Sequence, residues 1–141
     1  LYHYVYRENS LVNHGVTEKR CIVFSVLDWI CKDASANFPE AETCFLQTAL
    51  DTAARLAMQT VSADADKNTR NYLERFRDVV RCHFSWRALA LCPDGKSAAA
   101  ELALWGGIPI FKALAAIYRL IKHMKKKQSG VTGENGQSGS H

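Results

Sequence analysis

Two long runs of helical hydrophobic periodicity, joined by a short polar segment, dominate residues 39–91. In each run apolar side chains return every three or four residues, which is the period of one face of an α-helix. Each arm has about 22 residues and would be about 33 Å long at 1.5 Å per residue. Two helices cannot cover each other's apolar faces over such a length, so we expect the hairpin to pack against a further partner.

The chain on both sides of the hairpin is also predicted to be helical. One helix opens at Thr17 and fades by Asn37, and its apolar stripe is broad enough to predict a heavily buried helix. The stripe consists of Ile22, Val23, Val26, Leu27, Trp29 and Ile30. Two later helices are expected at 97–104 and 110–126, with a Gly- and Pro-containing break between them at 105–109. No run alternates apolar and polar residues, so the predicted fold class is all-α.

A single domain is predicted, because 141 residues with 48% hydrophobic content are enough for one core. We place this domain at residues 1–127. Near its start, Tyr2, Tyr4 and Tyr6 alternate with other residues, which suggests an extended arm. Residues 128–141 are rich in Gly and Ser, which predicts a disordered polar tail. No stretch reaches the roughly 18 apolar residues of a membrane span.

Positive charge gathers near the end of the chain, because residues 102–133 contain no Asp or Glu. The basic residues there include Lys112, Arg119, Lys122, Lys125, Lys126 and Lys127. Such clustering indicates an anionic partner or the root of a basic arm. A solvated helix end gives the same pattern, since lysines suit a helix C-terminus. The sequence does not decide between these two interpretations.

The residue types that carry catalysis are present but are not arranged for it. No nucleophile motif, Gly-rich phosphate loop or His-Glu-x-x-His sequence occurs. The five cysteines form no CxxC pair, which favours small buried hydrophobes in a reducing compartment. Cys82 and His83 are adjacent and would point about 100° apart on a helix, so they do not form a metal site. His83 is expected to be a packed, hydrogen-bonded residue. The sequence therefore predicts no enzyme, no cofactor and no metal.

Three short strings stand out in and before the hairpin. They are Asp33-Ala34-Ser35-Ala36, then Cys44 followed by Thr48-Ala49-Leu50, then Arg77-x-Val79-Val80-x-x-His83-x-Ser85. The first ends the helix before the hairpin, the second lies early in the first arm, and the third lies late in the second arm. In content and order they resemble the core protein of hepatitis B virus and its hepadnavirus-like relatives, over about residues 24–86.

The resemblance implies a fold and a function. In that family the hairpins of two subunits pair into a four-helix bundle, the dimers close into an icosahedral shell, and a basic tail binds the packaged genome. We therefore expect a viral capsid protein that forms a homodimer and then a shell, found in the virion and in the host-cell cytoplasm or nucleus. The hairpin is shorter here, Ala57 replaces the cysteine of the inter-subunit disulfide, and the Pro-rich arm and Arg-rich tail are missing. These departures suggest a distant member, for instance a nackednavirus of fish.

Three sets of residues receive roles from this resemblance. The expected dimer interface consists of Leu46, Ala49, Leu50, Ala53, Ala57, Phe76, Val80 and Phe84. The expected contacts between dimers are Trp105, Ile108, Pro109, Phe111, Leu114 and Tyr118. The residues expected to bind nucleic acid are Lys122, Lys125, Lys126 and Lys127.

A helical interaction module of the apoptosis-regulator type is the alternative class. In that case the helix at 110–126 would lie on a membrane surface, which its apolar face and lysines would permit. The size of the purified protein in solution discriminates between the two classes, because a capsid protein forms shells and an interaction module stays small.

Overall fold

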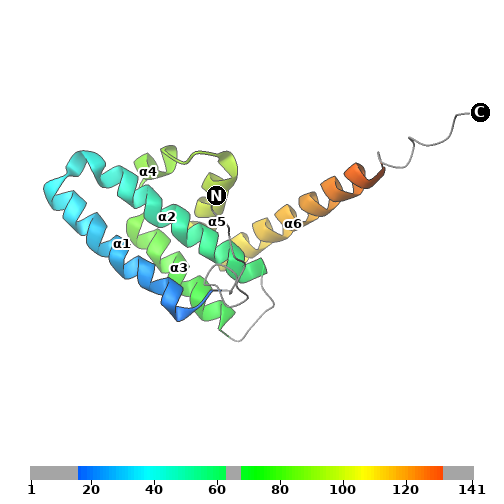
Figure 1. Cartoon of the computed structure of the whole chain (residues 1–141), viewed down its shortest axis with the longest axis horizontal. Helices are drawn as coiled ribbons and strands as arrows, with labels where there is room; N and C mark the ends of the chain where they lie inside the picture. The colour runs from blue at the N-terminus through cyan, green and yellow to red at the C-terminus, as the bar shows by residue number, and fades with distance from the viewer. Residues whose placement is uncertain (1–15, 63–67, 132–141) are drawn as a thin grey trace, which may run out of the picture.

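Six α-helices make up the part of the chain that the computed structural model describes, residues 16–62 and 68–131. They are α1 (Glu18–Asn37), α2 (Pro39–Ser62), α3 (Thr69–His83), α4 (Trp86–Ala90), α5 (Gly95–Gly106) and α6 (Ile108–Val131) (Figure 1). No strand occurs among these residues, which confirms the all-α fold. The tyrosine-rich start, the centre of the predicted polar turn and the residues after 131 lie outside the described part.

The α2–α3 hairpin is covered by other helices of its own chain. α1 packs along α2, and α5 packs against both arms. The Phe24 ring of α1 reaches Phe76 of α3, with 5.5 Å between the ring centroids. Leu50 and Val80, one from each arm, have no exposed surface. The partner that the sequence predicts for the hairpin is therefore supplied largely by α1 and α5 of the same chain.

The two arms are unequal, with 24 residues in α2 and 15 in α3. The sequence predicts a second arm that continues to the end of the 39–91 pattern, but α3 ends at His83. Phe84 leaves the helix with an extended backbone (φ −62°, ψ 128°). Its ring then meets Trp86 edge-on at 5.1 Å and stacks on Trp105 at 5.0 Å. This aromatic cluster joins the start of α4 to the end of α5 and explains why the arm stops early.

The predicted break at 105–109 is mostly helical. Gly107 alone separates α5 from α6, and its φ of +149° lies in a region that favours glycine. Pro109 falls in the first turn of α6, where a missing N–H costs no helical hydrogen bond. At the other end of α5, the Asp94 carboxylate caps the helix by accepting hydrogen bonds from the backbone N–H groups of residues 96 and 97 (2.9 and 2.8 Å).

Only the first part of α6 belongs to the core. Phe111 is fully buried, and Arg119 donates a hydrogen bond to the carbonyl oxygen of Val61 at the end of α2. Every side chain at 119–130 is exposed, and this part of the helix extends away from the other helices (Figure 1). Residues 128–131 continue the helix, although the sequence assigned them to a disordered tail.

Phe76→Ala should destabilise the fold strongly, because the Phe76 side chain is fully buried and its ring contacts Phe24 and Tyr72. The expected loss in the free energy of unfolding is about 3–5 kcal/mol, measured by urea denaturation. Met124→Ala truncates an exposed apolar side chain on α6 and should change it by less than about 0.5 kcal/mol. Equal effects of the two substitutions would contradict this description of the core.

Candidate assembly surfaces

The residues predicted for the dimer interface lie mainly inside the single chain. Six of them are 0% exposed: Ala49, Leu50, Ala53, Ala57, Phe76 and Val80. Leu46 packs against the same core, and Phe84 is half-buried in the aromatic cluster. A side chain without exposed surface cannot touch a second chain unless the fold opens. A dimer through the hairpin stays a prediction, and in this structure it would have to use the outward edges of α2 and α3.

The residues predicted for contacts between dimers divide between the core and the surface. Phe111 is fully buried, whereas Trp105 and Pro109 are exposed. The remaining three are half-buried: Ile108, Leu114 and Tyr118. Most of this set therefore holds α6 to its own chain, and its role in assembly stays a prediction.

The outer side of α6 carries an apolar seam that those assignments left out. The α6 seam consists of Ile110, Ile117, Leu120, Ile121 and Met124, each at least 44% exposed. From Ile110 through Leu114 to Met124 the spacings alternate between four and three, the repeat by which one helix packs along another. The sequence alone shows that these apolar residues share one face of the helix. It does not show that a neighbouring face of the same helix, the one that carries Phe111, packs into the core.

Basic side chains cover another side of the exposed part of α6. The four lysines predicted to bind nucleic acid are all exposed: Lys122, Lys125, Lys126 and Lys127. Lys122 and Lys126 lie one turn apart, on the side of the helix opposite the seam, together with Lys112 and Arg119. Because α6 contains no acidic residue, this surface carries an uncompensated positive potential.

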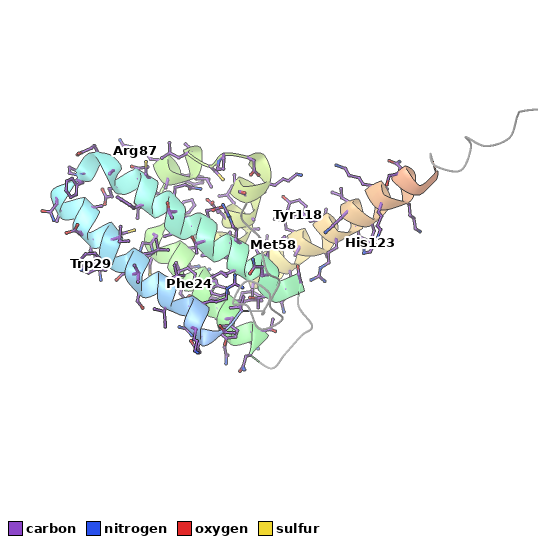
Figure 2. The ribbon with its side chains drawn as sticks, viewed as in Figure 1. Phe24, Trp29, Met58, Arg87, Tyr118 and His123 are labelled. Atoms are coloured by element: carbon purple, nitrogen blue, oxygen red, sulfur yellow. The ribbon has the colours of Figure 1, made fainter. Side chains whose placement is uncertain are left out.

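α1 presents a second exposed apolar surface, contrary to the expectation of a heavily buried helix. Ile22, Val26 and Trp29 are 61%, 50% and 67% exposed, and Val23 is 37% exposed. These four residues form the α1 stripe, and Figure 2 shows Trp29 on its outer side. The buried face of α1 is a different one, formed by Cys21, Leu27, Cys31 and Ala34. α1 is covered only on the side that meets the hairpin, so half of its apolar pattern faces outward.

A buried polar pair joins α2 to α5. Gln47 Nε2 donates a hydrogen bond of 2.9 Å to Oε1 of Glu101, whose side chain is 0% exposed. Gln47 Oε1 and Glu101 Oε2 are also buried and have no hydrogen-bond partner. Burial raises the pKa of the Glu101 carboxyl, and the hydrogen bond from Gln47 lowers it by less. A protonated carboxyl would also gain a donor on Oε2, which suits a site with an unpaired amide oxygen.

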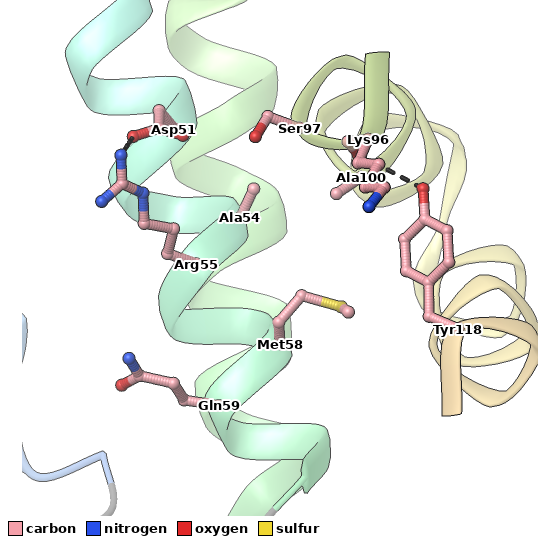
Figure 3. Close-up of a pocket in the computed structure, with 9 residues that line it drawn as sticks. All are labelled: Asp51, Ala54, Arg55, Met58, Gln59, Lys96, Ser97, Ala100 and Tyr118. Atoms are coloured by element: carbon pink, nitrogen blue, oxygen red, sulfur yellow. Dashed lines mark hydrogen bonds and ion pairs between the residues drawn. The ribbon is translucent and has the colours of Figure 1, made fainter. Parts of the chain in front are cut away.

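An open pocket of about 330 Å³ lies between α2, α5 and α6 (Figure 3). Two alanines, Ala54 and Ala100, leave the space between α2 and α5, and Met58 and the Tyr118 ring complete its apolar lining. Several polar groups at its rim already have partners within the chain. Asp51 pairs with Arg55 at 2.6 Å, and the Tyr118 hydroxyl donates to the carbonyl oxygen of Lys96 at 3.4 Å. We therefore assign it no ligand.

His83 is packed and hydrogen-bonded, as predicted. Its Nδ1 lies 3.0 Å from the carbonyl oxygen of Val79, and its Nε2 lies 3.5 Å from a carboxylate oxygen of Asp28. Across residues 16–62 and 68–131, no group of three or more His, Cys, Asp or Glu side chains could hold a metal ion. In the same residues, no helix has the length and apolar character needed to cross a membrane.

No protein-family model, no curated protein and no solved structure matches the chain. The resemblance to hepadnavirus core proteins therefore stays a prediction from three strings and their order. Function has to be argued from the surfaces of α1 and α6.

Glu101→Gln should stabilise the fold more at about pH 8 than at about pH 4. A raised pKa in the folded chain means that stability is full below the ordinary value of 4.5 and is lost as pH rises through the folded value. Glutamine has the shape of the protonated acid and offers a donor at every pH, so its advantage should grow with pH. The measurement is urea denaturation at both pH values.

Glu74→Gln makes the same chemical change at a carboxylate that pairs with Arg70 on the outer side of α3. It should shift the free energy of unfolding by less than about 0.5 kcal/mol at either pH. A Glu101→Gln effect that stays constant from acid to alkaline pH would contradict the raised pKa of the buried Glu101 carboxyl.

Proposed function

We propose that the chain is the structural subunit of a viral capsid, which associates with copies of itself into a closed shell around nucleic acid. The observation that carries this proposal is that the core is complete within one chain, while the α1 stripe and the α6 seam stay exposed. Exposed apolar helix surfaces of this kind mark protein–protein contacts. Two separate surfaces matter, because a single two-fold contact stops at a dimer and a shell requires at least one more.

The three hepadnavirus-like strings support the same class and add a specific dimer, a four-helix bundle made by two α2–α3 hairpins. With the inner faces enclosed, the bundle would use the outward edge of α2, where Cys44, Thr48 and Thr52 lie one turn apart. These side chains are small and uncharged, so two helices can approach closely there. The threonine hydroxyls already donate to backbone carbonyl oxygens of α2, at 2.9 and 2.7 Å. A helix contact here would therefore leave no hydroxyl donor without a partner.

The proposed contact with the packaged nucleic acid consists of four lysines of α6: Lys122, Lys125, Lys126 and Lys127. They lie on the part of the helix that extends from the body, where a polyanion can reach them from several sides. Lysines without a fixed geometry neutralise phosphates and carry no sequence information. The proposal therefore expects binding that is general for single-stranded nucleic acid, inside the virion and during assembly in the host cell.

Binding of α6 to a membrane surface is the second candidate function. One observation favours it: the α6 seam lies opposite Lys112, Arg119, Lys122 and Lys126, and a helix at a lipid–water interface divides its faces in this way. Flotation with vesicles that contain anionic lipid tests it. Flotation of a small species that forms no shells would favour this function over the capsid.

A truncation after Arg119 separates assembly from folding. It removes residues 120–141 but keeps Phe111 and Tyr118, so thermal unfolding should stay cooperative. The full chain should form uniform shells in negative-stain images at moderate salt, and the truncated chain should not. Shells from the truncated chain would show that α6 does not make the contact. A full chain that forms no shell at any salt concentration would contradict the capsid proposal.

Replacing Lys122, Lys125, Lys126 and Lys127 with glutamine should flatten the salt dependence of RNA binding. Four phosphate contacts on a single strand contribute a slope of about −2.8 in log K against log salt, at roughly 0.7 per contact. The control is a variant with the same loss of charge outside α6 and the α1 stripe, in which four exposed basic residues are replaced with glutamine: Lys32, Arg70, Arg87 and Lys96. If the salt titrations of the wild type and the first variant superimpose, the four lysines do not contact RNA and only form a solvated helix face.

A further inference from the structure

We propose that the α1 stripe binds the α1 stripe of a second copy, in antiparallel orientation, about a two-fold axis that passes beside Val26. The contact lies apart from the hairpin and from α6, and it does not rest on the capsid proposal. An α1 pair should form as the protein concentration rises, whether or not shells assemble.

The order of residues on the outer side of α1 is suited to pairing with itself. About an axis at Val26, residues equally far before and after it face each other across the contact. Val23 then meets Trp29 of the second copy, three residues to either side, and Ile22 meets Ile30, four residues to either side. All five residues fall on one face at 100° per residue. Val23 is thereby matched with the larger Trp29 and Ile22 with another isoleucine, and each match occurs twice in the symmetric contact.

Charges at the two ends of this face select the antiparallel orientation. Lys19 lies seven residues before Val26 and Asp33 lies seven residues after it, and both are exposed. Antiparallel pairing brings Lys19 of each copy beside Asp33 of the other, so both ends of the contact close with opposite charges. A parallel pair would place like charges together at each end, which is unfavourable.

The neighbouring charges of α1 are already engaged within the chain. Glu18 pairs with Arg75 of α3 at 2.7 Å, and Lys32 pairs with Asp28 at 2.7 Å. Asp33 accepts one hydrogen bond, from Asn37 Nδ2 to its Oδ1 at 2.8 Å, so its second oxygen is available for a lysine. The apolar residues and the two end charges are thus the groups that a second copy would meet.

The contact is short, and this sets the expected strength. From Lys19 to Asp33 the helix rises about 21 Å, about four turns. Two helices that meet over this length bury less surface than a stable, permanent dimer does. The expected product is a weak dimer that forms and dissociates readily, and it would weaken further with salt because of its end charges.

Sedimentation equilibrium of the full chain and of four variants tests the pairing. Val26→Arg places two arginines on the axis and should raise the dimer dissociation constant about tenfold or more. Lys19→Asp or Asp33→Lys alone puts like charges at both ends, and each should weaken the dimer about tenfold. The double variant Lys19→Asp/Asp33→Lys restores opposite charges at both ends and should recover the wild-type constant.

The substitutions are chosen so that a loss of dimerisation can be distinguished from a loss of folding. Aspartate near the start of α1 and lysine near its end both suit the helix dipole, so neither reversal should unwind the helix. As a further control, Lys96→Asp on α5 makes the same change in net charge as Lys19→Asp and should leave the dimer unchanged. No dimer in the wild type, unchanged association in Val26→Arg, or a double variant as weak as the single ones would each overturn the proposal.

Shell formation, scored in the same samples, distinguishes this inference from the proposed function. If shells form and the α1 variants dimerise like the wild type, the α1 pair is contradicted and the capsid proposal is not. If the dimer responds to the variants as predicted but the chain never forms shells, the α1 pair is supported and the capsid proposal is contradicted.

Discussion

Close packing around the alanines of α2 is the constraint on which the rest of the fold depends. Ala49, Ala53 and Ala57 recur every four residues, so they line one side of the helix, and none has exposed surface. Short side chains let neighbouring helices approach near the 8 Å end of the usual range. The space that remains is filled by larger residues such as Phe76 and Leu73 of α3. A larger side chain at any of the three alanines would push a neighbouring helix away from α2.

This packing completes the core within one chain, and it also leaves two helices half covered. α1 meets the hairpin with one side, and α6 meets α5 with its first turns only. The surfaces left over differ in chemistry: the α1 stripe is apolar with opposite charges at its ends, whereas the α6 seam is backed by lysines. Salt should affect them differently, because it weakens the attraction between the end charges of α1 and screens the repulsion among the lysines behind the α6 seam. Ionic strength is therefore a natural control over which contact dominates.

Local pattern was sufficient to predict the helices but not the faces they bury. Periodicity located α1, α2 and the start of α3, because an apolar stripe has to repeat with the helix. It did not show which of two adjacent apolar faces the chain itself would cover, and the expectation of a buried Ile22 and Trp29 failed for that reason. The early end of α3 escaped prediction as well, since Phe84 stacks on Trp105, a residue far along the chain. The buried Gln47–Glu101 pair depends on a similar long-range contact and has no local signal.

Sedimentation velocity of the full chain over a wide range of concentrations measures self-association most directly. If the exposed faces of α1 and α6 are contact surfaces, the single chain should give way to a dimer and then to a much larger closed particle as concentration rises. A single species with the mass of one chain at every concentration, still unfolding cooperatively, would contradict the proposal that these faces serve to join copies of the protein.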